Sequence, residues 1–515
     1  MSGTRLSPRA LVIGIDGGGF DVVDPLVERG MLPNIGGVLR RAASAVTETT
    51  WPAHTAPGWS TLVTASDPGR HGIYQFFDTQ DPDYGATITT ADRLGRSSAW
   101  DWLAAQGHTL GLVNIPMSHP PRALPGYQVT WPLTRTAHYC HPRTLLGELA
   151  RGGAPFRSDL ATMFRGDLGY LDEAERNVAA RARSMSYLLR HHPTDVAMVV
   201  FTEVDRVGHH YWHFCDDAHP RYEPAPDGSG WERALTRIYQ AVDAAIGELL
   251  ALVDSDTAVV LVSDHGLGLG RYGFAVHELL EQAGLLRTRP ATGASGAASW
   301  FTGGGREVDF ENTRVYQPVP GSYGLNVNLR GRQRRGAVRE SERRAVLDEV
   351  ADLLRGVAVP GGGRLVREVL PREDAYPGPH VSAAPDLLLV PADESVLVGP
   401  ELGQGLWHPS AQTGLHRHAG MWAHASPNAR PGRLAEPVRL TSVIPTLLTD
   451  LGAGWPSTVP GTPVTAALAS DVDVPGPRPE LERAEEASGP VAPAPTGPAE
   501  EDEYTRRRLR EMGYV

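Results

Sequence analysis

The sequence contains no lysine, because all 48 residues counted as lysine or arginine are arginines. Any mechanism that needs a lysine amine is therefore excluded. Cysteine is almost as scarce: Cys140 and Cys215 are the only two, and they lack CxxC spacing. This pattern argues against a disulfide framework and favours a reducing compartment.

Long apolar runs are absent as well. None approaches the ~18 residues that a membrane-spanning helix requires. The run at residues 10–15 is too short for the apolar region of a signal peptide, and it ends at Asp16. We therefore expect a cytoplasmic protein without a membrane span. The formal net charge of −12 argues against a nucleic-acid surface and against binding to anionic membranes.

The first half of the chain alternates between buried-strand and helical patterns. Strands are expected at residues 10–15, 109–113, 196–201 and 257–262, and helices at 22–42 (with a break at Pro33), 100–106, 172–190 and 231–253. This alternation is typical of an α/β domain with a mainly parallel central sheet.

The 515 residues are enough for one large domain with an insertion. We assign residues 8–270 and 405–470 to a discontinuous α/β core. Residues 271–404 are expected to form a smaller inserted cap region together with return strands of the core. The segment 472–502 is rich in Pro, Ala and Glu and should be a disordered linker, and residues 503–515 should form a short helix.

Thr55 stands at an expected helix start. It precedes Ala56-Pro57-Gly58 and a helix-like run, and a hydroxyl residue followed by proline fits the first turn of a helix. Such a start presents free backbone N–H groups and the positive end of a helix dipole, which suit an anion and a phosphate in particular. The local sequence alone favours a simple capping role for Thr55.

Acidic residues follow three of the expected strands. Asp16 follows the first strand, Asp205 follows residues 196–201 with His209 four residues later, and Asp264-His265 follow residues 257–262. The carboxyl ends of strands in an open parallel sheet line one crevice. Carboxylate and imidazole ligands suit Zn²⁺ or Mn²⁺.

Two such cations, ~4 Å apart, would need about this set of ligands and could activate the Thr55 hydroxyl as a nucleophile.

The loop Gly14–Gly19 could instead be a dinucleotide-binding fingerprint. That reading is disfavoured, because Asp16 would repel a pyrophosphate.

Several motifs together resemble the alkaline phosphatase superfamily, specifically its type I phosphodiesterase/nucleotide pyrophosphatase branch. They are GIDGGG at the first strand, TAPGWSTLVTA followed by PGRHGI, VDRVGHHYW, VSDHG and GLHRHAG, and the resemblance covers most of residues 10–455. It implies an alkaline-phosphatase-like three-layer sandwich, two metal ions that are usually zinc, and a covalent phospho-enzyme hydrolysed by water.

Residue by residue, the resemblance matches Thr55 to the nucleophile. Asp16, Asp264 and His265 match ligands of the metal ion that holds it, and Asp205, His209 and His416 match ligands of the other. Among the remaining histidines, His71 should bond backbone, while His210, His213 and His418 should lie outside the two ligand sets.

The substrate is less well specified. Family members resembled here carry an asparagine three residues after the nucleophile, where this chain has Gly58, so the Ala56 N–H, a water or Arg206 would have to hold a phosphate oxygen. Tyr323 and Asn326 in the insertion are further candidates for substrate contact.

We expect hydrolysis of a small-molecule phosphate diester or pyrophosphate. The sulfatase motif C/S-x-P-x-R is absent, and the phosphomutases of the superfamily rely on a lysine. Phosphomonoesterase and phospho-group transferase remain alternatives on the same scaffold, and a non-catalytic binding protein is a remote one. No nucleic-acid polymer is expected as a partner, and the oligomeric state stays open.

Overall fold

The central sheet of the computed structural model has ten strands, in the order β21-β2-β20-β7-β1-β6-β3-β4-β5, with β22 paired to β2. The structure describes residues 7–133, 136–158, 169–293 and 297–481. Five neighbouring strands run parallel: β7 (Ala258–Val262), β1 (Ala10–Ile15), β6 (Val196–Phe201), β3 (Leu110–Ile115) and β4 (Gly126–Thr130). These strands are buried on both faces, which explains why they are continuous apolar runs in the sequence.

The remaining strands extend the sheet at both sides. β20 (Ala419–Ala425) lies between β7 and β2 (Ala43–Glu48) and is antiparallel to both. The short strands β21 (Gly432–Arg433) and β22 (Val438–Arg439) pair with β2. β5 (Cys140–His141) is antiparallel to β4. The sheet is therefore mainly parallel, as predicted.

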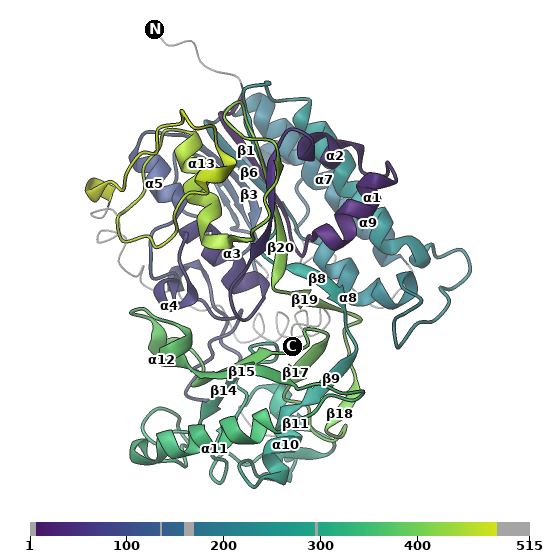
Figure 1. The fold of residues 1–515 in the computed structure, drawn as a ribbon, viewed down its shortest axis with the longest axis vertical. Helices are drawn as coiled ribbons and strands as arrows, with labels where there is room; N and C mark the ends of the chain where they lie inside the picture. Colours follow the sequence, from purple (N-terminus) through teal and green to yellow (C-terminus); the bar gives the residue numbers. More distant parts are fainter. Residues whose placement is uncertain (1–6, 134–135, 159–168, 294–296, 482–515) are drawn as a thin grey trace.

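Helices cover both faces of the sheet, which makes a three-layer sandwich (Figure 1). Along β1, Leu11 and Ile13 belong to one apolar cluster and Ala10 and Val12 to another, because successive side chains of a strand point to opposite faces. The first face carries α1 (Phe20–Glu28), α2 (Pro33–Leu39), α7 (Tyr170–His191), α8 (Glu203–Cys215) and α9 (Ala234–Leu250). The second carries α3 (Thr55–Thr64), α5 (Ala99–Ala105) and α13 (Val443–Asp450).

A smaller lobe lies below the sandwich in Figure 1. Its largest sheet has the order β13-β14-β16-β15, formed by β13 (Val315–Tyr316), β14 (Gly324–Val327), β16 (Leu387–Pro391) and β15 (Val366–Pro371). A second sheet joins β17 (Val396–Gly399), β9 (Tyr272–Ala275) and β18 (Trp407–Pro409), and a third joins β10 (Thr288–Pro290), β12 (Arg306–Val308) and β11 (Thr302–Gly303). Helices α10 (Val276–Gln282), α11 (Arg343–Arg355) and α12 (Arg372–Ala375) complete this region.

The strands of this lobe pair only with one another among the described residues. The return strands that we expected within residues 271–404 are instead β20, β21 and β22, which come later in the chain. The sequence also did not predict that the segment after α3 joins the lobe. Ile73, Phe76, Phe77 and Tyr84 belong to the same apolar cluster as Phe274.

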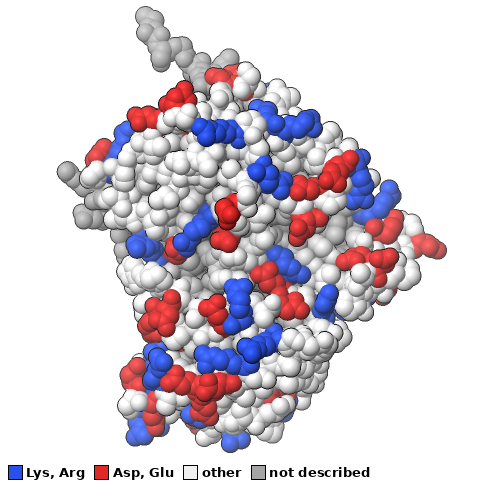
Figure 2. All heavy atoms as spheres, in the orientation of Figure 1, with Lys and Arg blue, Asp and Glu red and all other residues white. Residues whose placement is uncertain are grey.

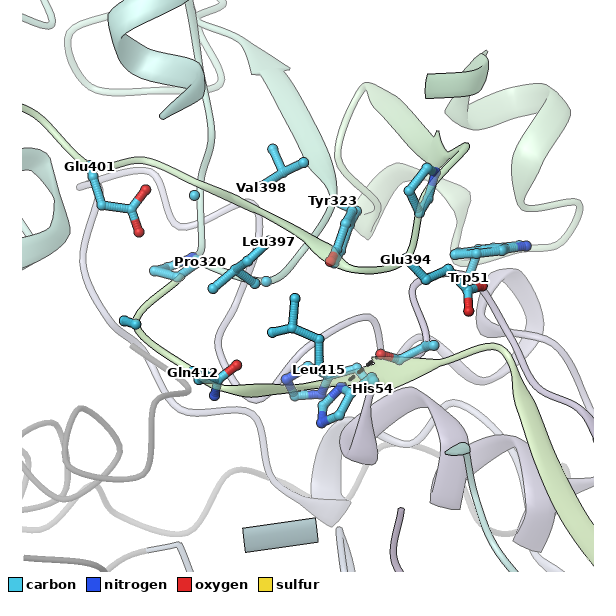
Figure 3. Close-up of a pocket in the computed structure, with 16 residues that line it drawn as sticks. Trp51, His54, Pro320, Tyr323, Glu394, Leu397, Val398, Glu401, Gln412 and Leu415 are labelled. Carbon is cyan, nitrogen blue, oxygen red and sulfur yellow. Dashed lines mark hydrogen bonds between the residues drawn. The ribbon is translucent and has the colours of Figure 1, made fainter. Parts of the chain in front are cut away.

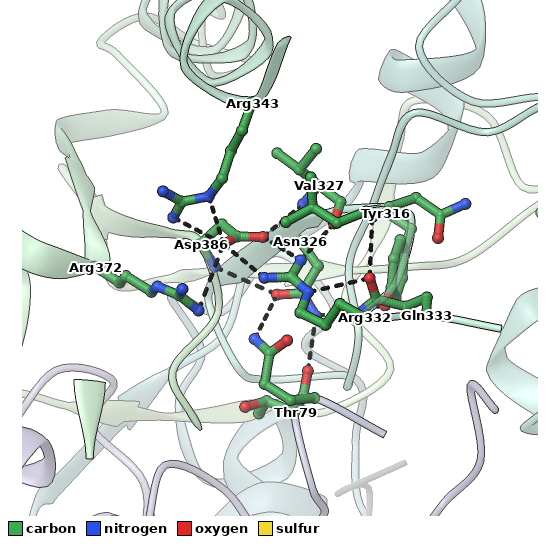
Figure 4. A network of polar contacts seen from close by, with 12 residues as sticks. Thr79, Tyr316, Asn326, Val327, Arg332, Gln333, Arg343, Arg372 and Asp386 are labelled. Atoms are coloured by element: carbon green, nitrogen blue, oxygen red, sulfur yellow. Dashed lines mark hydrogen bonds and ion pairs between the residues drawn. The ribbon is translucent and has the colours of Figure 1, made fainter. Parts of the chain in front are cut away.

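A buried carboxylate ties this lobe together (Figure 4). Asp386 is fully buried and receives hydrogen bonds or ion pairs from Arg332, Arg343 and Arg372. It also accepts from the Val327 backbone N–H at 2.9 Å. Burial alone would raise the pKa of Asp386, but the arginines hold it below its usual value.

The C-terminal part of the described chain remains attached to the sandwich. Leu481 is buried in the second apolar cluster, and the Arg478 N–H donates to the Trp455 carbonyl at 2.8 Å. Arg478 and Leu481 of the predicted linker at 472–502 therefore contact the sandwich, while the linker itself stays a prediction. Residues 482–502 and the helix predicted at 503–515 lie outside the described residues.

None of the described helices is long and apolar enough to cross a membrane. On the face shown in Figure 2, arginines and acidic side chains are interspersed rather than gathered by sign.

Candidate active site

Helix α3 places Thr55 near the carboxyl ends of the central strands, beside His265. The helix begins at Thr55, and its capping residue is His54, whose Nδ1 accepts from the Ala56 N–H at 3.3 Å. The capping role considered for Thr55 is therefore wrong. Its side chain is 1% exposed, and Oγ1 lies 3.3 Å from His265 Nε2.

The helix start does not offer the free N–H groups that we expected for a phosphate. The Ala56 N–H is bonded to His54, Pro57 has none, and the Gly58 N–H donates to the His54 carbonyl at 2.9 Å. The dipole of α3 still favours an anion at this end. The predicted phosphate contact of Ala56 thus loses its donor.

The first ligand group contains Asp16, Asp264 and His265, whose ligand atoms lie within 4.8 Å of one another. Asp16 follows β1, and the other two lie between β7 and β8 (Gly266–Leu269). His265 Nε2 is 3.3 Å from Asp264 Oδ2 and 3.7 Å from Asp16 Oδ1. Trp59, one turn after Thr55 on α3, donates its indole N–H to Asp16 Oδ2 at 3.0 Å and so orients that carboxylate.

The second group is formed by Asp205, His209 and His416. Asp205 and His209 are one turn apart on α8, so both point from the same side of the helix. His416 comes from β19 (Gly414–Arg417), which pairs antiparallel with β8. Asp205 Oδ1 lies 3.1 Å from the Nε2 atoms of both histidines, and these two Nε2 atoms are 3.0 Å apart. The structure thus brings together all seven residues predicted as ligands.

The three histidines share one orientation. Nδ1 of His209 is 2.7 Å from the Gly414 carbonyl, that of His265 is 3.0 Å from the Gly266 carbonyl, and that of His416 is 2.9 Å from the Ala53 carbonyl. A carbonyl can only accept, so each Nδ1 carries the proton. Each Nε2 lone pair therefore points into the site, which is the arrangement of metal-binding histidines.

The electrostatics of the two groups also fit cations. Burial, followed by the charges of Asp16 and Asp205, raises the pKa of Asp264 well above its usual value. Burial and neighbouring histidines lower the pKa of His265, so it stays neutral. Asp264 Oδ2 has no hydrogen-bond donor among the described residues. Three buried carboxylates and three imidazole lone pairs are a donor set for two divalent cations.

The sequence matches the type I phosphodiesterase / nucleotide pyrophosphatase family over residues 10–427. The chain belongs to this family. It is therefore a metal-dependent hydrolase of phosphoric esters. No sequence among curated proteins matches the chain.

Solved structures share the fold of this family member. Phosphonoacetate hydrolase from Sinorhizobium meliloti 1021, in complex with phosphonoformate, has a TM-score of 0.54 and 16% identity, with 87% of this chain and 95% of that chain covered. Murine ectonucleotide pyrophosphatase / phosphodiesterase 5 has a TM-score of 0.53 and 14% identity, with coverages of 89% and 100%. Wild-type alkaline phosphatase PafA has a TM-score of 0.52 and 13% identity, with coverages of 90% and 99%. Identities this low show the fold alone, and that fold is the predicted alkaline-phosphatase-like sandwich.

A cavity of about 160 Å³ in this phosphodiesterase-family chain lies between the sandwich and the smaller lobe (Figure 3). His416 and His54 contribute to its wall, so the cavity adjoins the second ligand group. The other lining residues come from the segment before α3, from the smaller lobe, from the loop before β19 and from β19 itself: Trp51, Ala53, Pro320, Gly321, Tyr323, Pro391, Glu394, Leu397, Val398, Gly399, Glu401, Ala411, Gln412 and Leu415.

The residues predicted for substrate contact occupy different places. Tyr323 lines the cavity and donates its hydroxyl to the Val396 carbonyl at 3.0 Å. Asn326 does not line it: its side chain is buried in the smaller lobe and donates to the Thr79 carbonyl at 2.7 Å (Figure 4). Arg206 is buried on α8, with its guanidinium 5.7 Å from the centre of the Trp131 ring.

Gly58 faces a ligand rather than the cavity. A Cβ added there would lie 3.0 Å from Asp264 Cβ and 3.3 Å from Asp264 Oδ2. The asparagine that we expected from the family resemblance would meet the same obstacle on this backbone. Glycine at this position keeps α3 close to Asp264.

Among the other histidines, His71 bonds backbone as predicted, since its Nδ1 accepts from the Ile73 N–H at 3.1 Å. His54 was missed as a residue of the site, although its place directly before Thr55 was the one signal that could have found it. Trp51, Glu394 and Gln412 carried no such signal, because the loops that bring them to the cavity are far apart in the sequence.

Proposed function

We propose that the protein hydrolyses phosphate diesters or pyrophosphates by way of a phospho-threonine at Thr55, with two divalent cations held by the seven clustered residues. Zinc suits the mixed carboxylate and imidazole set best, and manganese is the alternative. The observation that carries the proposal is the 3.3 Å distance between Thr55 Oγ1 and His265 Nε2, within the group that also holds Asp16 and Asp264.

The cations would lower the pKa of the Thr55 hydroxyl and neutralise charge on the phosphoryl oxygens. Residues of the chain hold the ligand side chains in place. Trp59 and the Gly17 N–H hold Asp16 and Asp264, at 3.0 and 3.4 Å. Three backbone carbonyls fix the histidine rings. Thr55 Oγ1 attacks phosphorus, the bond to the leaving oxygen breaks, and water then cleaves the phospho-threonine.

Burial keeps this chemistry away from competing water. Thr55, Asp205, Asp264 and His265 are each no more than 1% exposed, while His416 is 13% exposed at the cavity. Electrostatic interactions are stronger at such buried positions than in bulk water. The substrate therefore reaches the site from the side of His416.

Substitution of Thr55 tests the proposal. Thr55→Ala should lower kcat on an aryl phosphodiester to background while zinc content, measured by mass spectrometry, stays near two equivalents. Thr55→Ser should retain turnover, and an acid-quenched reaction should show one added phosphoryl group, still carrying the second ester group of the diester, on the peptide that contains residue 55.

Thr64→Ala is a matched control, because it removes a hydroxyl from the same helix at a position bonded only to the Ser60 carbonyl. It should keep activity near the wild-type level. Full activity of Thr55→Ala on the diester would refute the covalent mechanism. Metal-free but active protein would refute the two-cation site.

A further inference from the structure

The cavity beside His416 has an unusual balance of charge for a phosphate-processing site. Its only formally charged side chains among the described residues are two carboxylates, Glu394 and Glu401. The two histidines of the wall are engaged elsewhere: His416 donates its Nδ1–H to the Ala53 carbonyl, and His54 Nδ1 accepts from the Ala56 N–H. Figure 3 shows Glu401 and Glu394 toward opposite ends of the labelled lining.

The rest of the lining is largely apolar. Leu397, Val398, Leu415 and Tyr323 form the middle of the wall between the two carboxylates (Figure 3). Trp51 closes one end, with its ring stacked on His418 at 4.6 Å between centroids. Apolar and aromatic walls of this kind bind an organic group by burying its surface.

Two arginines lie near Glu394 but outside the wall of the cavity, and their charges act on its carboxyl group. The Arg417 guanidinium donates to the backbone carbonyls of Glu394, Leu415 and Leu269 and is thereby committed to backbone. Arg367 lies over the Trp51 ring at 5.8 Å, is 58% exposed and does not line the cavity.

The cavity also adjoins the second ligand group. It is lined by His416 of the second ligand group, and not by Thr55 or His265. In a displacement at phosphorus the leaving oxygen departs opposite the attacking one. A group attached to the leaving oxygen would therefore enter the cavity.

We propose that this cavity receives the leaving group and selects substrates in which that group is apolar and carries no negative charge. The inference rests on the proposed function and narrows it. Alkyl and aryl phosphodiesters are substrates, whereas pyrophosphates, whose leaving group is itself a phosphate, are disfavoured. Glu394 and Glu401 are the residues that determine this specificity.

Three methyl aryl phosphodiesters test the proposal. They carry a para-neopentyl, a para-trimethylammoniomethyl or a para-carboxymethyl substituent, so that shape is nearly constant for the first two and charge changes across the series. The neutral and cationic esters should have similar kcat/KM. The carboxymethyl ester and UDP-glucose should be at least about tenfold poorer, equivalent to about 1.4 kcal/mol.

Variants of Glu394 and Glu401 test whether these carboxylates cause the discrimination against the anionic ester. Glu394→Gln and Glu401→Gln should each raise the ratio of kcat/KM for the anionic ester to that for the neutral ester by several-fold. Glu311→Gln removes a negative charge from an exposed position of the same lobe and should leave that ratio unchanged. An unchanged ratio in both cavity variants would overturn the assignment.

A binding measurement separates this inference from the proposed function. By calorimetry, para-neopentylphenol should bind the metal-loaded protein at least tenfold more tightly than para-hydroxyphenylacetate, whether or not any ester is cleaved. Equal binding of the two, or UDP-glucose cleavage as efficient as that of the neutral ester, would overturn the inference. Loss of all cleavage with the binding preference intact would count against the phospho-threonine mechanism alone.

Discussion

Gly58→Ala should weaken metal binding while changing the stability of the fold little. The new Cβ would lie 3.0 to 3.3 Å from three atoms of Asp264, whereas carbon atoms pack best at about 3.5–4.0 Å. Relief of these contacts requires a shift of about 0.5 Å. Metal–ligand distances tolerate about 0.2 Å. The shift therefore exceeds what the Asp264 carboxylate can accept as a ligand.

The two contributions to stability nearly cancel. Alanine is about 1 kcal/mol more favourable than glycine in a helix interior, and overpacking costs about 1–3 kcal/mol. The free energy of unfolding of Gly58→Ala should thus fall by no more than about 2 kcal/mol. Zinc affinity should fall about 10- to 100-fold, as for other changes that misplace a ligand.

Competition with a zinc chelator measures the affinity, and urea unfolding measures the stability. Gly147→Ala is the matched control, because Gly147 also lies in a helix, α6 (Leu145–Arg151), and nothing lies within 4 Å of a Cβ added there. It should stabilise the protein slightly and leave zinc affinity unchanged. Wild-type zinc affinity in Gly58→Ala would refute the argument that glycine makes room for Asp264.

Three further predictions concern buried charges. Asp386→Asn should lower the free energy of unfolding by about 3 kcal/mol, since it leaves three partly buried arginines without their charged partner, and urea unfolding would show it. The pKa of Asp386 is depressed in the folded protein, so its ionised carboxylate stabilises the fold above its pKa in the unfolded chain, which is about 4. This stabilisation is lost as pH falls through the folded pKa. The difference in unfolding free energy between wild type and Asp386→Asn should therefore shrink in acid. For Asp264 the folded pKa is raised, so its own contribution to the stability of metal-free protein should be greatest below about pH 4 and be lost as pH rises. Thermal melts of zinc-loaded protein should not show this loss. Arg181→Met, which leaves Glu203 without its 2.6 Å partner, should destabilise by about 3–5 kcal/mol, and a wild-type melting temperature would contradict this.

The strands of the sandwich and the candidate metal ligands could be predicted because short stretches of sequence indicate them. β1 and β6 are apolar runs with the same bounds in sequence and structure, and Asp16, Asp205 and Asp264 follow such runs directly. β2 was missed because its residues Ala43–Glu48 alternate small, apolar and polar side chains and gain their partners from β20, nearly 400 residues later. No local pattern records that pairing.

The substrate side could not be predicted for a similar reason. The cavity combines the segment before α3 with loops of the smaller lobe, and only packing brings Trp51 beside Glu394. Asn326 resembled a contact residue because a polar side chain in an apolar strand often serves a ligand, yet its partners are Thr79 and Asp386. The cytoplasmic location and the absence of a nucleic-acid partner remain predictions.

The position of β20 has a consequence for how the protein is made. β20 is synthesised after more than four fifths of the chain, yet it fills a place between β2 and β7. Until residue 425 has left the ribosome, β2 and β7 both lack the partner strand that they have in the complete sheet, and their unpaired backbone groups are open to pairing with other chains. His416, just before β20, arrives in the same step. The growing chain therefore closes its sheet and completes its ligand set together, so that no incomplete chain has a working site.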